Sequence, residues 1–212
     1  MKDTKRRPSF PSRLHNNMII TLVDTEFKPS FSDNTYFFEV DSSKSELNPI
    51  KKSKTCREYR ITLNYKEITV CCPVFKDVNK NSIVYIPSYI LPHRGYPVSV
   101  YLYAIALYLS SKLSMRATAA EVKRKFGLET FSHSTISRSL SRISENIHHI
   151  TVVHNADFTH PTLRTDRAWE EITRAKYLKV LIFLNTLLNE NEFTNGSKVN
   201  YDYFRRTKRF II

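Results

Sequence analysis

The sequence predicts an α+β protein, in which a small antiparallel β region is followed by a helical domain containing a helix-turn-helix. Before about residue 95, apolar and polar side chains alternate in short runs, which is typical of strands. From Pro97 onward, apolar residues recur every three to four positions, which is typical of helices. The chain also carries 33 Lys and Arg residues against 20 Asp and Glu, a net charge of +13. Such an excess favours polyanionic partners, nucleic acid above all.

Three segments are expected along the chain. Residues 1–17 are basic and poor in large apolar side chains, so they are expected to form a flexible basic arm. This arm is either a frayed terminus or a contact to phosphates and the minor groove. Residues 18–95 are expected to form the β-rich region. Residues 96–212 are expected to form the helical domain, with the helix-turn-helix at 118–147.

Strands are expected where β-branched and aromatic residues gather or alternate with polar ones. They are predicted at Met18–Asp24, Tyr36–Val40, Tyr59–Tyr65, Ile68–Cys72 and Ile83–Ile86. The third and fourth of these strands form a predicted hairpin that turns at Lys66 and Glu67. The polar stretch from 42 to 53 predicts a loop. Pro87 is expected to end the last strand, because proline lacks the N–H that a sheet needs.

The first predicted helix of the helix-turn-helix spans Ala119–Phe126. Thr118 is its expected cap, and Glu121 stands where it can complete a capping box. Gly127 is expected to end this helix, because glycine readily adopts the left-handed conformation of a helix C-terminus. Leu128–Phe131 then forms a short connection.

The second predicted helix is capped by Ser132 and runs from His133 to about Ile147. Its apolar face consists of Ile136, Leu140, Ile143 and Ile147. The opposite face carries Ser134, Arg138, Ser141 and Arg142. Arginine can bond guanine through two hydrogen bonds, and serine can reach base edges or phosphates. An ordinary pair of antiparallel helices with solvated basic faces is the structural alternative.

The residues expected to contact DNA lie on both of these helices. Basic residues of the first helix suit backbone phosphates, and residues from Ser132 onward suit base edges. The full set is Lys123, Arg124, Lys125, Ser132, His133, Ser134, Thr135, Ser137, Arg138, Ser141 and Arg142.

Further helices are predicted on either side of this pair. The first spans Val98–Leu113 and starts after Pro97, which suits a helix beginning. Tyr177–Leu188 is apolar nearly all round, so it either fills the core or forms a homodimer interface. Tyr201–Ile212 interleaves aromatic and basic residues. That segment either grips single strands or lies over the core with its basic groups in water.

The segment YIPSYILPHRGYP at 85–97, followed by a helix and then SHSTISRSLSRI at 132–143, resembles transposase-derived bacterial proteins. Those proteins carry a zinc ribbon, a segment of the kind LP-x-x-L-x-PY-x-x-Y and a helix-turn-helix. The resemblance covers about residues 57–147. The parts that match are Ile86-Pro87, Ile90-Leu91-Pro92-His93, Tyr96 and Ser134–Arg138. The resemblance implies a recognition helix at the last of these.

The zinc ribbon and the catalytic domain of that family do not carry over. A ribbon needs four ligands, usually on two Cys-x2-Cys knuckles, whereas Cys71 and Cys72 are adjacent and Cys56 stands alone. We therefore expect a degenerate ribbon without metal or cofactor. About 65 residues follow the helix-turn-helix, too few for a nuclease core with three metal-binding carboxylates. The chain is accordingly not expected to be an enzyme.

The expected function is sequence-specific binding of double-stranded DNA, as a transcriptional regulator or a DNA-binding protein derived from a mobile element. One alternative is an RNA- or single-strand-binding accessory protein. Another is a protein–protein adaptor that uses the apolar helix at 177–188. No membrane segment and no secretory signal is expected. The cytoplasm of a bacterial cell is the expected compartment, with the nucleoid as the place of action.

Overall fold

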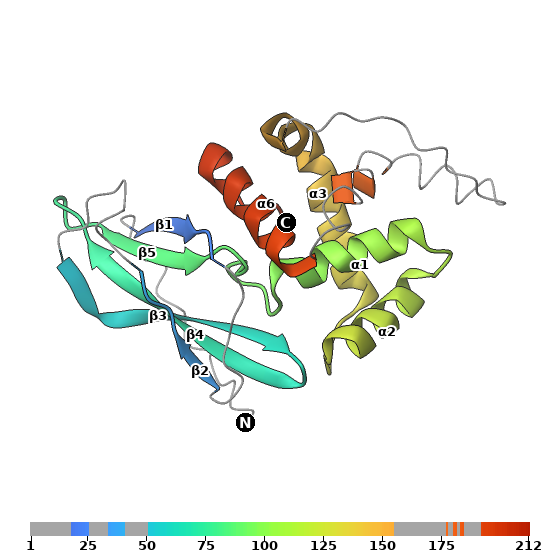
Figure 1. Ribbon diagram of the computed structural model, residues 1–212, viewed down its shortest axis with the longest axis horizontal. Helices are drawn as coiled ribbons and strands as arrows, with labels where there is room; N and C mark the ends of the chain where they lie inside the picture. The colour runs from blue at the N-terminus through green and yellow to red at the C-terminus, as the bar shows by residue number, and fades with distance from the viewer. Residues whose placement is uncertain are drawn as a thin grey trace, which may run out of the picture.

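The computed structural model describes residues 18–25, 34–40, 51–154, 177, 180–181, 183–184 and 192–212. The predicted basic arm at 1–17 lies outside this part of the chain. The fold is mixed α and β, with one five-stranded sheet beside a group of helices (Figure 1). Every described strand precedes residue 95 and every described helix follows it, which confirms the α+β class.

The sheet contains five strands: β1 Met18–Val23, β2 Thr35–Phe37, β3 Lys51–Leu63, β4 Lys66–Lys76 and β5 Ser82–Pro87. β4 pairs antiparallel with β3 along its length and with β5 near its end. β1 runs parallel to β5, and β2 runs parallel to β4. The expected antiparallel region is therefore a mixed sheet. Alternation of side chains predicts the faces of a strand but not which strand lies beside it. The two parallel pairings could therefore not be predicted from the sequence.

The hairpin of β3 and β4 differs from the prediction in two ways. Its two-residue turn lies at Asn64 and Tyr65, not at Lys66 and Glu67. Both turn residues have positive φ, 50° and 59°, which matches the twist of the strands that they join. Asn-Tyr is a less obvious turn signal than Asn-Gly, and the prediction missed it. β3 also begins at Lys51, inside the stretch predicted as a loop.

Three cysteines lie in this hairpin. Cys71 and Cys72 point to opposite faces of the sheet, as adjacent strand residues must, and Cys72 is fully buried in the sheet core. The expectation that Cys56 stands alone is wrong. Strand pairing sets Cys56 opposite Pro73 and Glu58 opposite Cys71, so Cys56 and Cys71 share a face.

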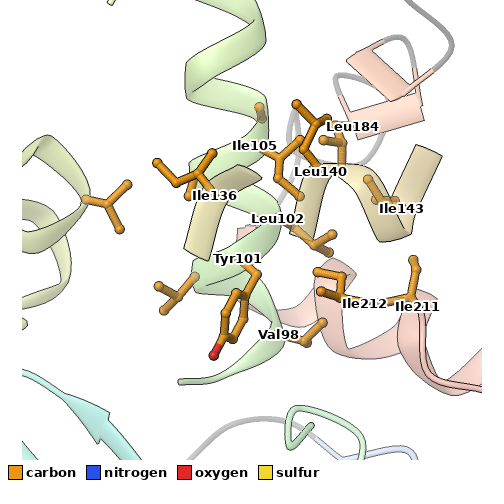
Figure 2. Packing of buried hydrophobic residues seen from close by; sticks show 14 of the residues in the cluster. Val98, Tyr101, Leu102, Ile105, Ile136, Leu140, Ile143, Leu184, Ile211 and Ile212 are labelled. Atoms are coloured by element: carbon orange, nitrogen blue, oxygen red, sulfur yellow. The ribbon is translucent and has the colours of Figure 1, made fainter. Parts of the chain in front are cut away.

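The described helices are α1 Val98–Ser110, α2 Met115–Phe126, α3 His133–His154 and α6 Glu192–Thr207. α1 is the central one, and its apolar side chains meet those of α3 and of the later segments in one core (Figure 2). The residues that point toward one another there include Leu102, Ile105, Ile136, Leu140, Ile143, Leu184, Ile211 and Ile212. α1 ends at Ser110, earlier than predicted.

α6 lies between the sheet and the other helices (Figure 1). Tyr203 belongs to the helical core and Phe204 to the sheet core, and both are buried. Asn200 is also buried. Its Nδ2 donates to the Ser88 carbonyl at 2.8 Å, and its Oδ1 accepts from the Ile211 amide at 3.3 Å. Through Asn200, α6 therefore bonds both the connection between β5 and α1, at Ser88, and the C-terminal segment, at Ile211.

This packing bears on two predictions, the apolar helix at 177–188 and the aromatic and basic segment at 201–212. In the predicted helix at 177–188, the four described apolar side chains Val180, Leu181, Phe183 and Leu184 are buried in the core of their own chain. Because Tyr203 and Phe204 are buried as well, they are not exposed to stack on bases. None of the described helices is long and apolar enough to cross a bilayer.

Candidate nucleic-acid interface

α2 begins one turn earlier than the sequence predicts. Ser114 is its cap, and its Oγ accepts a hydrogen bond from the Ala117 amide at 3.2 Å. Thr118 lies inside the helix, where its hydroxyl donates to the Ser114 carbonyl at 2.9 Å. Glu121 pairs with Arg124 and forms no capping box. The predicted cap at Thr118 is wrong because Ser114 offers an equivalent cap four residues earlier, and one more helical turn then forms.

Gly127 ends α2 in the left-handed conformation, with a φ of 58°. The β3–β4 turn rests directly on this helix end (Figure 1). The Asn64 amide donates to the Phe126 carbonyl at 2.8 Å, and the Tyr65 amide donates to the Gly127 carbonyl. A Cβ atom on Gly127 would lie 2.8 Å from Asn64 Cα. Glycine is thus required twice, by the backbone conformation and by the close approach of the hairpin.

The connection between α2 and α3 is held by buried apolar and aromatic side chains. Leu128 and Phe131 are buried in the helical core. The ring of Phe131 lies against Tyr96 and Tyr101, with centroid distances of 5.3 and 6.3 Å. The Tyr96 hydroxyl also donates to the Thr130 carbonyl. The connection is therefore fixed both to α1 and to the segment before it.

α3 begins as predicted. Ser132 is its cap, and its Oγ accepts from the Thr135 amide at 3.3 Å. Ile136, Leu140 and Ile143 are buried against α1, and Ile147 packs at the edge of the same core. The helix continues to His154, past the predicted end at Ile147. The predicted apolar face is confirmed.

The opposite face of α3 is open to solvent. Ser137, Arg138, Ser141 and Arg142 are exposed, as are Ser132 and His133 at the helix start; Ser134 and Thr135 are half-buried. Arg138 is oriented along the helix, because its Nε and Nη2 donate to the carbonyl and the hydroxyl of Ser134 at 3.2 and 3.3 Å. Serine and arginine side chains thus line one accessible surface of α3.

Arg94 joins this surface, although it precedes α1 and was not among the predicted contacts. Its guanidinium carbon lies 5.6 Å from the Tyr101 ring centroid. Burial lowers the pKa of Arg94, and the nearby positive charges of Arg142 and Arg138 lower it further, against an opposing effect of Tyr101. The guanidinium group of Arg94 therefore lies within reach of the positive charges of both Arg138 and Arg142. Within the described ranges, none of the three forms an ion pair with a carboxylate.

We refer to Arg94, Arg138 and Arg142 as the arginine cluster. The sequence placed only the last two on a common face, because their spacing within one helix is enough to do so. Arg94 is 44 residues from Arg138 along the chain, and the two become neighbours only when α1 packs across α3. One indication in the sequence that Arg94 belongs near α3 was its place in the segment that resembles the transposase-derived proteins.

The three basic residues of α2 that were predicted to contact phosphates differ in their partners and in their exposure. Arg124 donates from Nε to Glu121 Oε2 at 3.1 Å, in an exposed pair. Lys125 turns toward α1, where its Nζ lies 3.8 Å from the Tyr103 ring centroid. Lys123 is partly exposed. An exposed ion pair contributes little, so Lys123 and Arg124 are both available to an anion, whereas the ammonium group of Lys125 lies over the Tyr103 ring.

Two exposed carboxylates, Glu129 and Glu145, precede and follow the arginines of α3 along the chain. Glu129 is exposed in the connection between α2 and α3. Glu145 lies one turn beyond Ser141 on α3 and accepts from its hydroxyl at 3.2 Å. Positive charge is thus concentrated on the first half of α3, where the partial positive charge of the helix N-terminus adds to it.

Comparisons of the chain with protein-family models, with curated proteins and with solved structures found no match. The resemblance to transposase-derived proteins stays a prediction from the sequence.

Proposed function

We infer that this protein binds double-stranded DNA with sequence preference, through a helix-turn-helix made of α2, the connection at 127–132 and α3. The observation that carries the inference is the arginine cluster. The positive charge of Arg94 is influenced by those of Arg138 and Arg142, and none of the three forms an ion pair with a carboxylate among the described residues. Such repulsion costs folding free energy, and a polyanion that binds the surface relieves it.

In this proposal the first half of α3 enters the major groove. Arg138 donates to O6 and N7 of a guanine, and its bonds to Ser134 hold the guanidinium in place beforehand. Ser137 and Ser141 are small and exposed, so the helix backbone can approach the base edges closely. The long isoleucine and leucine side chains of α3 face the core and do not obstruct this approach.

Phosphate contacts come from residues that flank α3. Arg94 stands beside the helix, next to Arg138 and Arg142. Lys123 and Arg124 lie on α2, which in a helix-turn-helix crosses the DNA backbone. Their contacts position the protein without reading the sequence. Regulation of transcription or of a mobile element is the role that this kind of binding serves.

The test measures binding of the full chain to a labelled duplex at several salt concentrations, with a single strand of equal length as comparison. Arg94→Ala combined with Lys123→Ala is expected to flatten the slope of log K against log salt, by about 0.9 for each lost phosphate contact. Lys54→Ala combined with Lys80→Ala removes the same charge from exposed positions of the sheet and serves as the matched control.

Preferential binding to the single strand would contradict the proposal, and so would equal weakening by both double variants. The single-strand alternative gains no support from Tyr203 and Phe204, since both are buried. The adaptor alternative predicts negligible nucleic-acid affinity in the same measurement.

A further inference from the structure

Two thiols and a carboxylate meet on the outer face of the β3–β4 hairpin. The Sγ atoms of Cys56 and Cys71 and a carboxylate oxygen of Glu58 all lie within 4.8 Å of one another. The register explains this, because Glu58 stands directly opposite Cys71 and Cys56 follows on the same face two residues away. Cys72 points to the other side and is fully buried.

The chemistry of these groups suits a divalent metal better than a disulfide. Cys56 and Cys71 occupy diagonal positions, where Cα atoms generally lie about 7–8 Å apart, whereas the Cα atoms of a disulfide usually lie about 5.5–6 Å apart. A metal ion bridges the larger separation, since two Zn–S bonds of about 2.3 Å place tetrahedral ligands about 3.8 Å apart. The three donor atoms lie within 4.8 Å of one another, which is near that spacing.

The carboxylate is available for this role. Within the part of the chain that the structure describes, Glu58 forms no ion pair, and the nearby Arg60 is directed to Glu67 at 3.8 Å. Cys56 and Glu58 are exposed, and Cys71 is buried beside them. The cluster thus has two ligands that an incoming ion reaches from solvent and one that anchors it to the sheet.

We propose that Cys56, Glu58 and Cys71 bind one Zn²⁺ ion per chain, with water as the fourth ligand. On binding, each thiol releases its proton to solvent, and the two sulfurs and the carboxylate oxygen replace water molecules of the hydrated ion, with no change of oxidation state. The site is not built from Cys-x2-Cys knuckles. It cross-links β3 to β4 next to the register shift between Lys52 and Cys56, where the ladder of backbone hydrogen bonds is interrupted.

The test titrates Co²⁺ into the reduced, metal-free full chain and follows the thiolate-to-cobalt charge-transfer absorption, which zinc then displaces. One equivalent is expected to saturate the signal. Cys56→Ser, at an exposed position that leaves the core intact, removes one of the two sulfur ligands and is expected to reduce the thiolate band and to weaken binding. Glu58→Gln is expected to weaken binding about tenfold or more. Glu67→Gln, an exposed carboxylate of the same hairpin, is the matched control and keeps the parental affinity.

Absence of the thiolate band in the reduced parent would overturn the proposal. So would unchanged affinity in Cys56→Ser or Glu58→Gln, or equal weakening in Glu67→Gln. Formation of a Cys56–Cys71 disulfide in air, seen as a loss of two hydrogens by mass, together with no metal binding after reduction, would also overturn it. The readout involves no nucleic acid, so its failure leaves the proposed DNA binding untouched.

Discussion

Arg94 shows how a single residue changes the electrostatics of the proposed interface. Its charge lies partly buried over Tyr101 and close to Arg138 and Arg142. Arginine stays charged even when its pKa is lowered, because the ordinary value is so high. The repulsion of Arg94 by Arg138 and Arg142 therefore persists near neutral pH, and a phosphate bound beside them would offset it.

Arg94→Ala is expected to weaken binding to all duplex sequences alike and to reduce the salt slope by about 1. The reason is that a phosphate contact carries affinity without sequence information. Binding titrations at three salt concentrations measure both effects. Lys80→Ala, at an exposed turn of the sheet, is expected to change neither; an equal effect of the two variants would mean that only net charge matters.

At the scale of elements, the end of α2 and the tip of the hairpin depend on each other. The hairpin amides of Asn64 and Tyr65 bond carbonyls of the α2 terminus, which otherwise need another donor. Gly127 makes this contact sterically feasible. The sheet thereby fixes the point at which the chain turns from α2 toward α3.

Gly127→Ala is expected to lower the free energy of unfolding by about 2 kcal/mol or more, from left-handed strain and from the clash with Asn64. Urea unfolding of the purified chain measures the loss. Gly95→Ala is the matched control, since no atom lies within 4 Å of its added Cβ, and it is expected to stay within about 0.5 kcal/mol of the parent. Equal stability of the two variants would refute the docking account.

Elements with strong local signals were predictable. The apolar stripe of α3, its cap at Ser132 and the terminating Gly127 are properties of a few neighbouring residues. The start of α2 was not, because Ser114 and Thr118 both suit a cap. Arg94 in the arginine cluster, and Cys56 beside Cys71, depend on which helices and strands pack together. No pattern within a single element carries that information.

At the scale of the whole molecule, α6 joins the sheet core to the helical core. Asn200 is the polar centre of this junction, because it bonds both Ser88 and Ile211. Arg94 lies six residues after Ser88, in the same connection between β5 and α1 that Asn200 bonds.

Asn200→Ala is expected to destabilise the chain by about 2 kcal/mol or more, because a buried carbonyl and a buried amide lose their partners. Thermal or urea unfolding measures it. Asn79→Ala, at an exposed turn position, is the control, and a comparable loss there would argue against a special role for Asn200.

Alkaline pH is expected to destabilise the fold through buried phenols. Burial raises the pKa of Tyr89 and raises that of Tyr101 to about 12, from an ordinary 10.0. A raised pKa in the folded state means that the stabilising contribution is complete below about pH 10 and is lost as the pH rises toward 12. Unfolding free energies measured across this range check the trend. Tyr101→Phe is expected to flatten it, and an unchanged slope would contradict the assignment.

The most direct test of the proposed function selects bound duplexes from a random pool with the parent chain and with Arg138→Ala. The parent is expected to enrich a defined motif. Arg138→Ala is expected to relax the preference at one position by about 1–3 kcal/mol and to keep the rest of the motif. No enriched motif from the parent, or the same motif at the same strength from both proteins, would contradict the account of α3 as the helix that reads DNA.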